Sequence, residues 1–121
     1  MTPARKLAAF CEQYHVRTAW HGPNDLSPVG MATQMHLDLA SPNFGIQEFA
    51  GFNEAEEEVF PGCPQVRKGY AYLDDAPGIG VDFDEKAAAK YPPVEMDFSW
   101  LSAVWRMVLL CGHKRKMRKT I

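Results

Sequence analysis

Two stretches decide the fold of this chain: residues 16–30, VRTAWHGPNDLSPVG, and residues 41–49, SPNFGIQEF. Each contains a short apolar strand, predicted over residues 16–20 in the first and residues 44–49 in the second. The segment between the two strands has apolar residues at helical spacing. The sequence therefore predicts a strand–helix–strand unit, in which the two strands are parallel neighbours and a helix makes the crossover.

Ionisable residues occur at the same end of both predicted strands. His21 and Asp25 follow the first strand, and Glu48 stands at the end of the second. A parallel α/β barrel builds its active site at the C-terminal ends of its strands. These three side chains are therefore the candidate site of the chain.

The remaining local signals place helices and strands around this unit. Thr2-Pro3 and Ser27-Pro28 each read as an N-cap residue followed by a first-turn proline, so each predicts the start of a helix. Residues 66–73 read as one strand, and Asp84 reads as the cap of a short helix over residues 85–90.

Composition limits the classes of protein to which the chain can belong. The 121 residues carry a formal net charge of −2, which argues against a general nucleic-acid binder. Three cysteines, an odd number without metal-type spacing, suggest free thiols in a reducing compartment. The N-terminus lacks the pattern of a secretory signal, and the apolar residues 100–112 are too short to span a bilayer. We therefore expect a cytoplasmic protein with no membrane partner.

Several longer motifs point to one family. In order along the chain they are residues 2–9, the two stretches above, residues 57–62, residues 75–82 and residues 84–92. Together they resemble the mannonate dehydratase-like sugar-acid dehydratases, mandelate racemase-like members of the enolase superfamily that are often called starvation-sensing proteins. Such enzymes are roughly three times longer than this chain, within the upper range of the barrel fold with an added domain.

The resemblance implies an α/β fold, namely the truncated C-terminal part of a (β/α)8 TIM-type barrel. Residues 1–50 would form the last two βα units, and residues 51–100 would form a C-terminal segment packing towards the capping-domain side. Residues 101–121 no longer resemble the family. The full-length family members are expected to be homo-oligomers.

The resemblance also implies a role for the candidate site. In the family, the strand ends that match His21, Asp25 and Glu48 face a sugar acid with a carboxylate and several hydroxyls. Each residue also has a plainer interpretation. His21 and Glu48 could be ordinary strand-end residues, and Asp25 could be a turn or cap residue before the next helix.

The catalytic metal of the family has no ligands in this chain. The family holds Mg²⁺ with carboxylates at the ends of three middle strands, where it stabilises the enediolate formed when a base removes the proton next to the substrate carboxylate. We therefore expect the chain alone to bind no metal and to be inactive. The acidic pairs at residues 74–75 and 82–85 are interpreted as turn and helix-cap residues.

The C-terminus needs a separate explanation, because family members usually end in a short polar tail with Asp-Gly-Thr. A shifted reading of one permitted codon choice for residues 104–108 encodes Leu-Glu-Asp-Gly, and a stop codon is permitted near residue 114. We therefore predict a frameshift near residues 100–103. The alternative is a non-enzymatic remnant or interaction protein in which the basic residues 114–119 form a binding arm.

Overall fold

The computed structural model describes residues 1–93 and divides the chain into two units, Met1–Tyr91 and Pro92–Ile121. The predicted frameshifted tail lies outside the described residues. The elements of the first unit are, in order, α1 (Thr2–Glu12), β1 (Thr18–Trp20), α2 (Pro28–Leu39), β2 (Phe44–Gln47), α3 (Glu54–Val59), β3 (Gln65–Arg67), β4 (Tyr70–Tyr72) and α4 (Glu85–Ala88).

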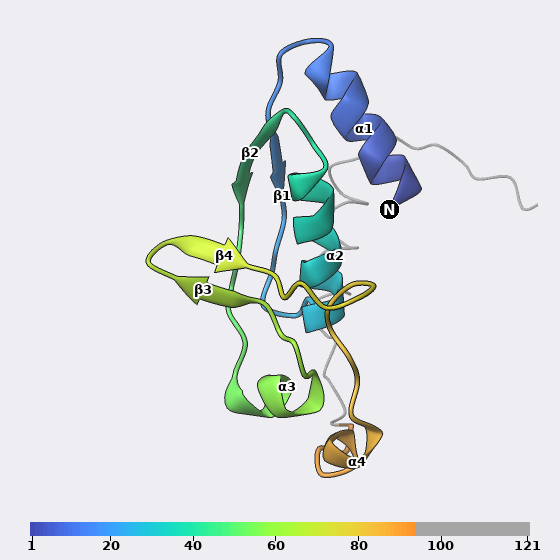
Figure 1. Ribbon diagram of the computed structural model, residues 1–121, viewed down its shortest axis with the longest axis vertical. Coiled ribbons are helices and arrows are strands. Elements are labelled where there is room, and N and C mark those ends of the chain that lie inside the picture. The colour runs from blue at the N-terminus through green and yellow to red at the C-terminus, as the bar shows by residue number, and fades with distance from the viewer. Residues whose placement is uncertain (94–121) are drawn as a thin grey trace, which may run out of the picture. The chain divides into compact units, whose positions relative to one another are not determined.

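The predicted strand–helix–strand unit is present. β1 and β2 pair in parallel, with Thr18 opposite Phe44 and Trp20 opposite Gln47. α2 connects them and lies along one face of the pair, as Figure 1 shows. Both strands are shorter than predicted, and in the described residues neither is paired with a third strand.

The start and the buried face of α2 follow from its sequence. The Ser27 hydroxyl accepts a hydrogen bond from the Gly30 amide at 3.2 Å, and Pro28 occupies the first turn, so this predicted cap is confirmed. Met31, Ala32 and Met35 are buried, since residues three and four apart share one face of a helix. They form the centre of the small core.

α1 differs from its prediction at its N-terminus. Met1, not Thr2, is the N-cap residue, and no side chain caps this end of the helix. The long apolar side chains Leu7 and Phe10 are exposed, at 52% and 61%, and the buried residue of the helix is Ala8. Ala8 lies where α1 approaches the segment between α2 and β2, because its carbonyl oxygen accepts a hydrogen bond from the side chain of Asn43.

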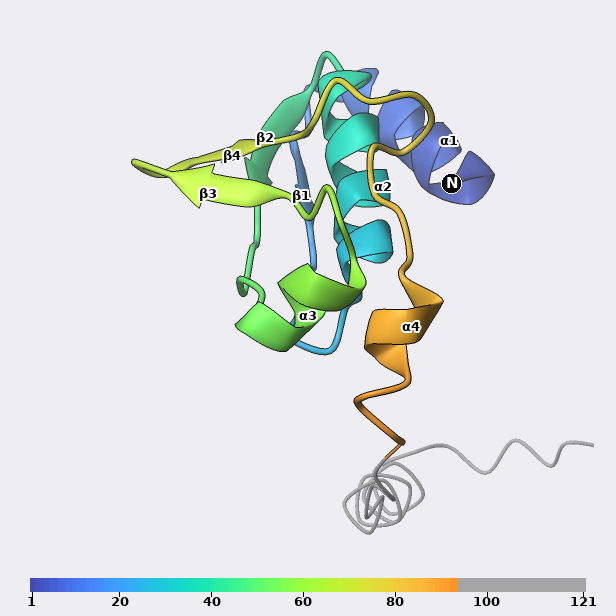
Figure 2. The ribbon, with the colours of Figure 1, turned by 60° about the horizontal axis from the view of Figure 1, so that its bottom comes forward.

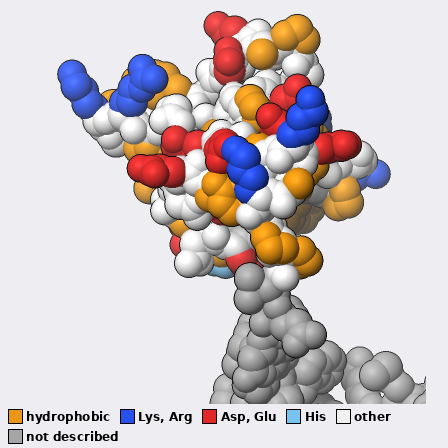
Figure 3. Space-filling model, turned by 90° about the horizontal axis from the view of Figure 1, so that it is seen from below, with side chains coloured by type: hydrophobic (Ala, Val, Ile, Leu, Met, Phe, Trp, Pro, Cys, Tyr) orange, Lys and Arg blue, Asp and Glu red, His pale blue; other side chains and the backbone are white. Residues whose placement is uncertain are grey.

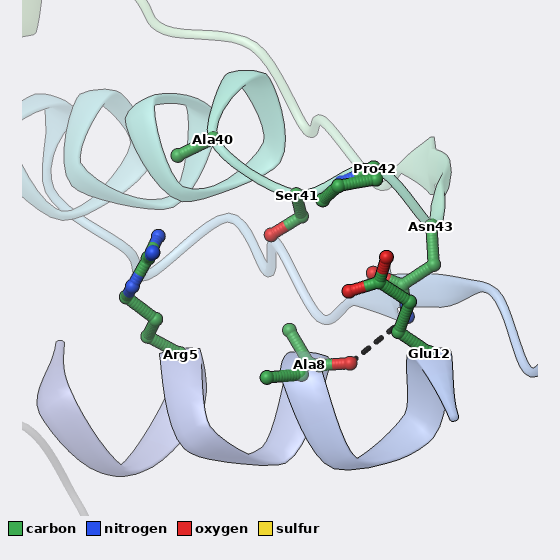
Figure 4. Close-up of a pocket in the computed structure, with 8 residues that line it drawn as sticks. Arg5, Ala8, Glu12, Ala40, Ser41, Pro42 and Asn43 are labelled. Carbon is green, nitrogen blue, oxygen red and sulfur yellow. Dashed lines mark hydrogen bonds between the residues drawn. The ribbon is translucent and has the colours of Figure 1, made fainter. Parts of the chain in front are cut away.

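The side chain of Asn43 connects α1 to the segment between α2 and β2. Its Nδ2 atom donates hydrogen bonds to the carbonyl oxygens of Ala8, at 3.0 Å, and Val16, at 2.8 Å. A cavity of about 50 Å³ lies beside the first of these bonds, between α1 and the end of α2 (Figure 4). It is far along the unit from the predicted site residues and contains none of them.

The predicted single strand over residues 66–73 is wrong. The structure has an antiparallel hairpin there, with Val66 opposite Ala71 and Arg67 opposite Tyr70. Lys68 and Gly69 form its turn with φ angles of 52° and 80°. Two residues with positive φ are what a tight two-residue hairpin turn requires, and Lys-Gly is a weaker signal for it than Asn-Gly.

Two short helices lie side by side in the second half of the unit (Figure 2). α3 begins with a capping box, in which Asn53 and Glu56 exchange hydrogen bonds with each other's backbone. α4 begins at Asp84, whose carboxylate accepts bonds from two backbone amides as predicted. Glu58 on α3 binds Lys90 and accepts a hydrogen bond from the Tyr91 hydroxyl at 2.8 Å, which joins the two helices.

The surface mixes apolar and charged side chains. Figure 3 shows hydrophobic side chains among acidic and basic ones on one face of the molecule. Among residues 1–93, no helix is both long enough and apolar enough to span a membrane.

A buried carboxylate stands out in the interface between α2 and β1. Asp38 is 7% exposed, and neither of its carboxylate oxygens has a hydrogen-bond partner in the described part of the chain. Burial raises the pKa of Asp38 to about 6, although the nearby indole of Trp20 acts in the opposite direction. The folded chain therefore binds a proton at this residue more tightly than the unfolded chain does.

This difference predicts an unusual pH dependence of stability. Because the folded pKa is the higher one, the contribution of Asp38 to stability should rise as the pH falls from about 7 to about 4. The D38N variant has no carboxylate to ionise, so it should be more stable than the parent by about 3 kcal/mol at pH 8 and by little at pH 4. Urea unfolding at both pH values measures this.

The matched control is Asp75→Asn, which removes the same charge from an exposed loop. If D38N and D75N showed the same dependence on pH, the buried carboxylate would not be the cause.

Candidate functional site

The ends of β1 and β2 bring His21 and Glu48 together. Trp20 and Gln47 are opposite each other in the parallel register, so the residues that follow them leave the sheet side by side. The Glu48 Oε2 atom accepts a hydrogen bond from the backbone amide of Gly22 at 3.1 Å. The same oxygen lies 3.6 Å from Nε2 of His21.

The two side chains are open to solvent. The exposed fraction is 77% for the His21 side chain and 58% for that of Glu48. A carboxylate accepts hydrogen bonds, and an imidazole donates or accepts at either ring nitrogen. The pair therefore offers both kinds of hydrogen-bonding group to a ligand at the strand ends.

Glycine is required at position 22. A Cβ atom built there would lie 2.0 Å from the backbone oxygen of Glu48. Because that neighbour is backbone and not the end of a flexible side chain, it has little freedom to move away. The absence of a side chain is what allows the two strand ends to approach.

Asp25 takes no part in this contact. It is exposed in the turn before Ser27, and among residues 1–93 no hydrogen bond or ion pair joins it to His21 or Glu48. Its predicted substrate contact stays a prediction. Its place in the chain also suits a simple turn residue.

A hollow of about 410 Å³ lies beside the pair. It is lined by Ala19, Trp20, His21, Ile46, Gln47 and Glu48. Ala19 and Ile46 lie opposite each other in the paired strands, and both are exposed. Side chains alternate between the two faces of a strand, and α2 covers only one face. The site thus has polar groups at the strand ends and an apolar floor on the uncovered face.

Sequence reasoning missed two glutamines behind the site. Gln34 on α2 donates a hydrogen bond from Nε2 to the carbonyl oxygen of His21 at 3.0 Å. Gln47 donates from Nε2 to Oε1 of Gln34 at 2.9 Å and to the carbonyl oxygen of Glu48 at 2.7 Å. A polar residue beside Glu48 in β2 and another on the sheet-facing side of α2 were the available signals.

The described residues do not form a metal site. Among residues 1–93, no group of three or more His, Cys, Asp or Glu side chains is arranged to hold a metal ion. Two of the acidic residues that could suggest one have backbone partners. Asp82 accepts from the Phe83 amide, and Asp84 accepts from the amides of Lys86 and Ala87. These residues do not fit the Mg²⁺ of the family by themselves.

Comparison with known proteins decides the family. Residues 1–87 match the family model described as enolase C-terminal domain-like. This chain belongs to that family. The predicted fold, a truncated C-terminal part of an enolase-type barrel, is therefore confirmed, as is the resemblance to sugar-acid dehydratases of the enolase superfamily.

Individual relatives agree with this assignment. A D-galactonate dehydratase family member of Enterocloster bolteae is 74% identical over 85% of this chain and 26% of its own length. The crystal structure of an enolase from Pantoea ananatis, with bound D-gluconate and Mg, is 59% identical, with a TM-score of 0.73 over 76% of this chain. An enolase of the mandelate racemase subgroup from Agrobacterium tumefaciens has a TM-score of 0.65 and 25% identity over 74% of this chain.

The comparisons also show how little of a relative this chain represents. It spans about a quarter of the length of the curated Enterocloster bolteae protein and 22% of the Pantoea ananatis structure. The curated relative is named for galactonate and the Pantoea ananatis structure contains D-gluconate, and the sequence motifs predicted a dehydratase of the mannonate, gluconate or galactonate type. All three are sugar acids.

The close approach at Gly22 gives a direct test of the site geometry. In Gly22→Ala the new methyl group must push the backbone of Glu48 away, so the strand ends should separate. We expect the free energy of unfolding to fall by about 1–3 kcal/mol, the usual cost of overpacking. The ring signals of His21, followed by NMR, should shift because Glu48 moves away.

Gly51→Ala is the control. Position 51 also follows β2, but a Cβ atom there meets nothing within 4 Å. That variant strains only its own backbone, at a φ of 88°, and should leave the His21 signals in place. Unchanged His21 signals in G22A would show that the strand ends are not in contact.

Proposed function

We propose that this chain supplies one side of the substrate site of a Mg²⁺-dependent sugar-acid dehydratase, with His21, Asp25 and Glu48 contacting the substrate hydroxyls. The observation that carries the proposal is the His21–Glu48 pair at the C-terminal ends of two adjacent parallel strands. Parallel barrels bind their substrates at this end. The known relatives are named for sugar-acid chemistry.

The chemistry of the pair suits a polyhydroxylated ligand. A sugar acid has several adjacent hydroxyls, each of which donates and accepts. The Glu48 carboxylate accepts a hydrogen bond from one backbone amide and is still more than half exposed, so its other lone pairs can accept hydrogen bonds from ligand hydroxyls. His21, with a largely exposed ring, can donate to a hydroxyl or exchange a proton with it.

The proposed role is binding and orientation, and it involves no metal contact by this chain. The described residues provide no set of ligands for Mg²⁺. In the proposal, the metal and the base that acts beside the substrate carboxylate are held by other parts of the barrel. We further propose that the complete protein is a cytoplasmic homo-oligomer. The alternative basic arm lies in residues 114–119, outside the described residues.

The proposal predicts that the purified chain has no dehydratase activity. D-Galactonate, D-gluconate and D-mannonate should each remain unchanged with and without Mg²⁺, because the base and the metal ligands are missing. Formation of the 2-keto acid, trapped with semicarbazide and followed by absorbance, measures this. Turnover that is abolished by Glu48→Gln would overturn it.

A chimera tests the role of the pair. Residues 1–91 of this chain replace the aligned C-terminal segment of the Pantoea ananatis enolase, whose structure contains D-gluconate and Mg. Calorimetric titration with D-gluconate in the presence of Mg²⁺ then measures the affinity. His21→Ala and Glu48→Gln should each weaken binding about tenfold, the loss expected for a hydrogen bond to a charged group.

His36→Asn is the matched control. His36 lies on α2 with its Nε2 atom 3.0 Å from the carbonyl oxygen of Ile79, and it does not line the hollow. Its replacement should leave the affinity for D-gluconate unchanged. If His21→Ala had no more effect than His36→Asn, the proposed substrate contact would be wrong.

A further inference from the structure

We propose that Gln34 and Gln47 are positioning residues that fix the backbones of His21 and Glu48 in their relative orientation. This inference rests on the proposed function, because it assigns a purpose to residues behind the same site. Neither glutamine is proposed to touch the substrate.

Three hydrogen bonds form one continuous chain between the two site residues. The carbonyl of His21 accepts from Gln34, the side-chain oxygen of Gln34 accepts from Gln47, and the Nε2 atom of Gln47 also donates to the carbonyl of Glu48. The chain crosses from the end of β1 to α2 and returns to the end of β2. We call these two side chains the glutamine bridge.

The bridge requires amide side chains. Gln34 must donate from its nitrogen and accept at its oxygen, and an amide is the group that does both in one plane. Both partners of the Gln47 nitrogen are acceptors, so that side chain uses its two N–H groups and no hydroxyl could replace it. The partners therefore fix the orientation of both amides.

The two site side chains make few contacts that would fix their positions. The His21 side chain is 77% exposed and so is not held by packing. In the described residues the Glu48 carboxylate accepts one hydrogen bond, from the amide of Gly22, and lies 3.6 Å from the exposed ring of His21. The bridge connects the backbones of His21 and Glu48 to α2. This helix contributes most of the buried core residues, so the bridge anchors the site to well-packed structure.

Stability alone does not explain the bridge. The Oε1 atom of Gln47 is buried and has no hydrogen-bond partner in the described part of the chain, which costs free energy. Apart from Asp38, the buried residues of α2 are apolar, as Met31 and Met35 are. An apolar pair at positions 34 and 47 would avoid the unsatisfied acceptor, so the polar pair has to serve the geometry of the strand ends.

The test separates positioning from folding. In the chimera with the Pantoea ananatis enolase, Gln34→Met and Gln47→Met are combined, which replaces the polar pair by an apolar pair of similar size. Replacing both partners of the bond between Gln34 and Gln47 is close to neutral for stability. The carbonyls of His21 and Glu48 lose their donors, but these bonds are exposed, so water can replace the amides. We expect the melting temperature to be unchanged or higher, while the affinity for D-gluconate with Mg²⁺ falls threefold to tenfold.

A double-mutant cycle shows whether the effect passes through the site. Gln34→Met should weaken binding in the parent chimera and have a smaller effect once His21 is Ala, because one of the two residues that the bridge positions is then gone. Gln65→Met is the control, since Gln65 binds Glu57 at 3.2 Å, away from the strand ends. An equal loss in both backgrounds, or a loss accompanied by a lower melting temperature, would overturn the proposal.

A ligand-free readout keeps this inference distinct from the proposed function. The ring signals of His21 in the chimera, titrated by NMR without D-gluconate, should change in Gln34→Met and not in Gln65→Met. If His21→Ala left the affinity unchanged, the proposed substrate contact would fail, and these signals would still decide whether the bridge positions His21. Identical His21 signals in both variants would show that it does not.

Discussion

The parallel contact between β1 and β2 is the interaction on which the rest of the described unit depends. It brings together residues that are 26 positions apart, and it does so at very short range. Glycines at two positions allow the backbones of the two strands to come this close. A Cβ atom at position 45 would lie 2.7 Å from the oxygen of Thr18, and one at position 22 would lie 2.0 Å from that of Glu48. Without this approach, neither the core under α2 nor the site at the strand ends could form.

The described unit has an unequal distribution of packing around this contact. One face of the strand pair is covered by α2, and its buried residues form the core. On the other face Ile46 is 67% exposed, and on α1 Phe10 is 61% exposed. Exposed apolar residues on both a sheet face and a helix are typical of a piece whose partners lie elsewhere. That agrees with the fraction of its relatives that the chain spans.

Much of this could be predicted from the sequence, for reasons that differ between elements. The Ser27 and Asp84 caps are local, so a few residues determine them, and both were predicted correctly. The hairpin was missed because Lys68 adopts a positive φ angle, which is uncommon for lysine and so is not predicted from the sequence. The proximity of His21 and Glu48 followed from strand topology, whereas the glutamine bridge depends on the directions of side chains across an interface and could not be predicted from residue spacing.

The contacts of the candidate site share one further property. Every hydrogen bond among His21, Gly22, Gln34, Gln47 and Glu48 joins residues of a single continuous segment of the chain. If such a segment were transferred to another barrel, the hydrogen bonds that fix the site geometry would be transferred with it. Recombination at only two points in a gene could move it between barrels of the same superfamily, and substrate preference could then change in one evolutionary step while the metal-binding strands remained as they were.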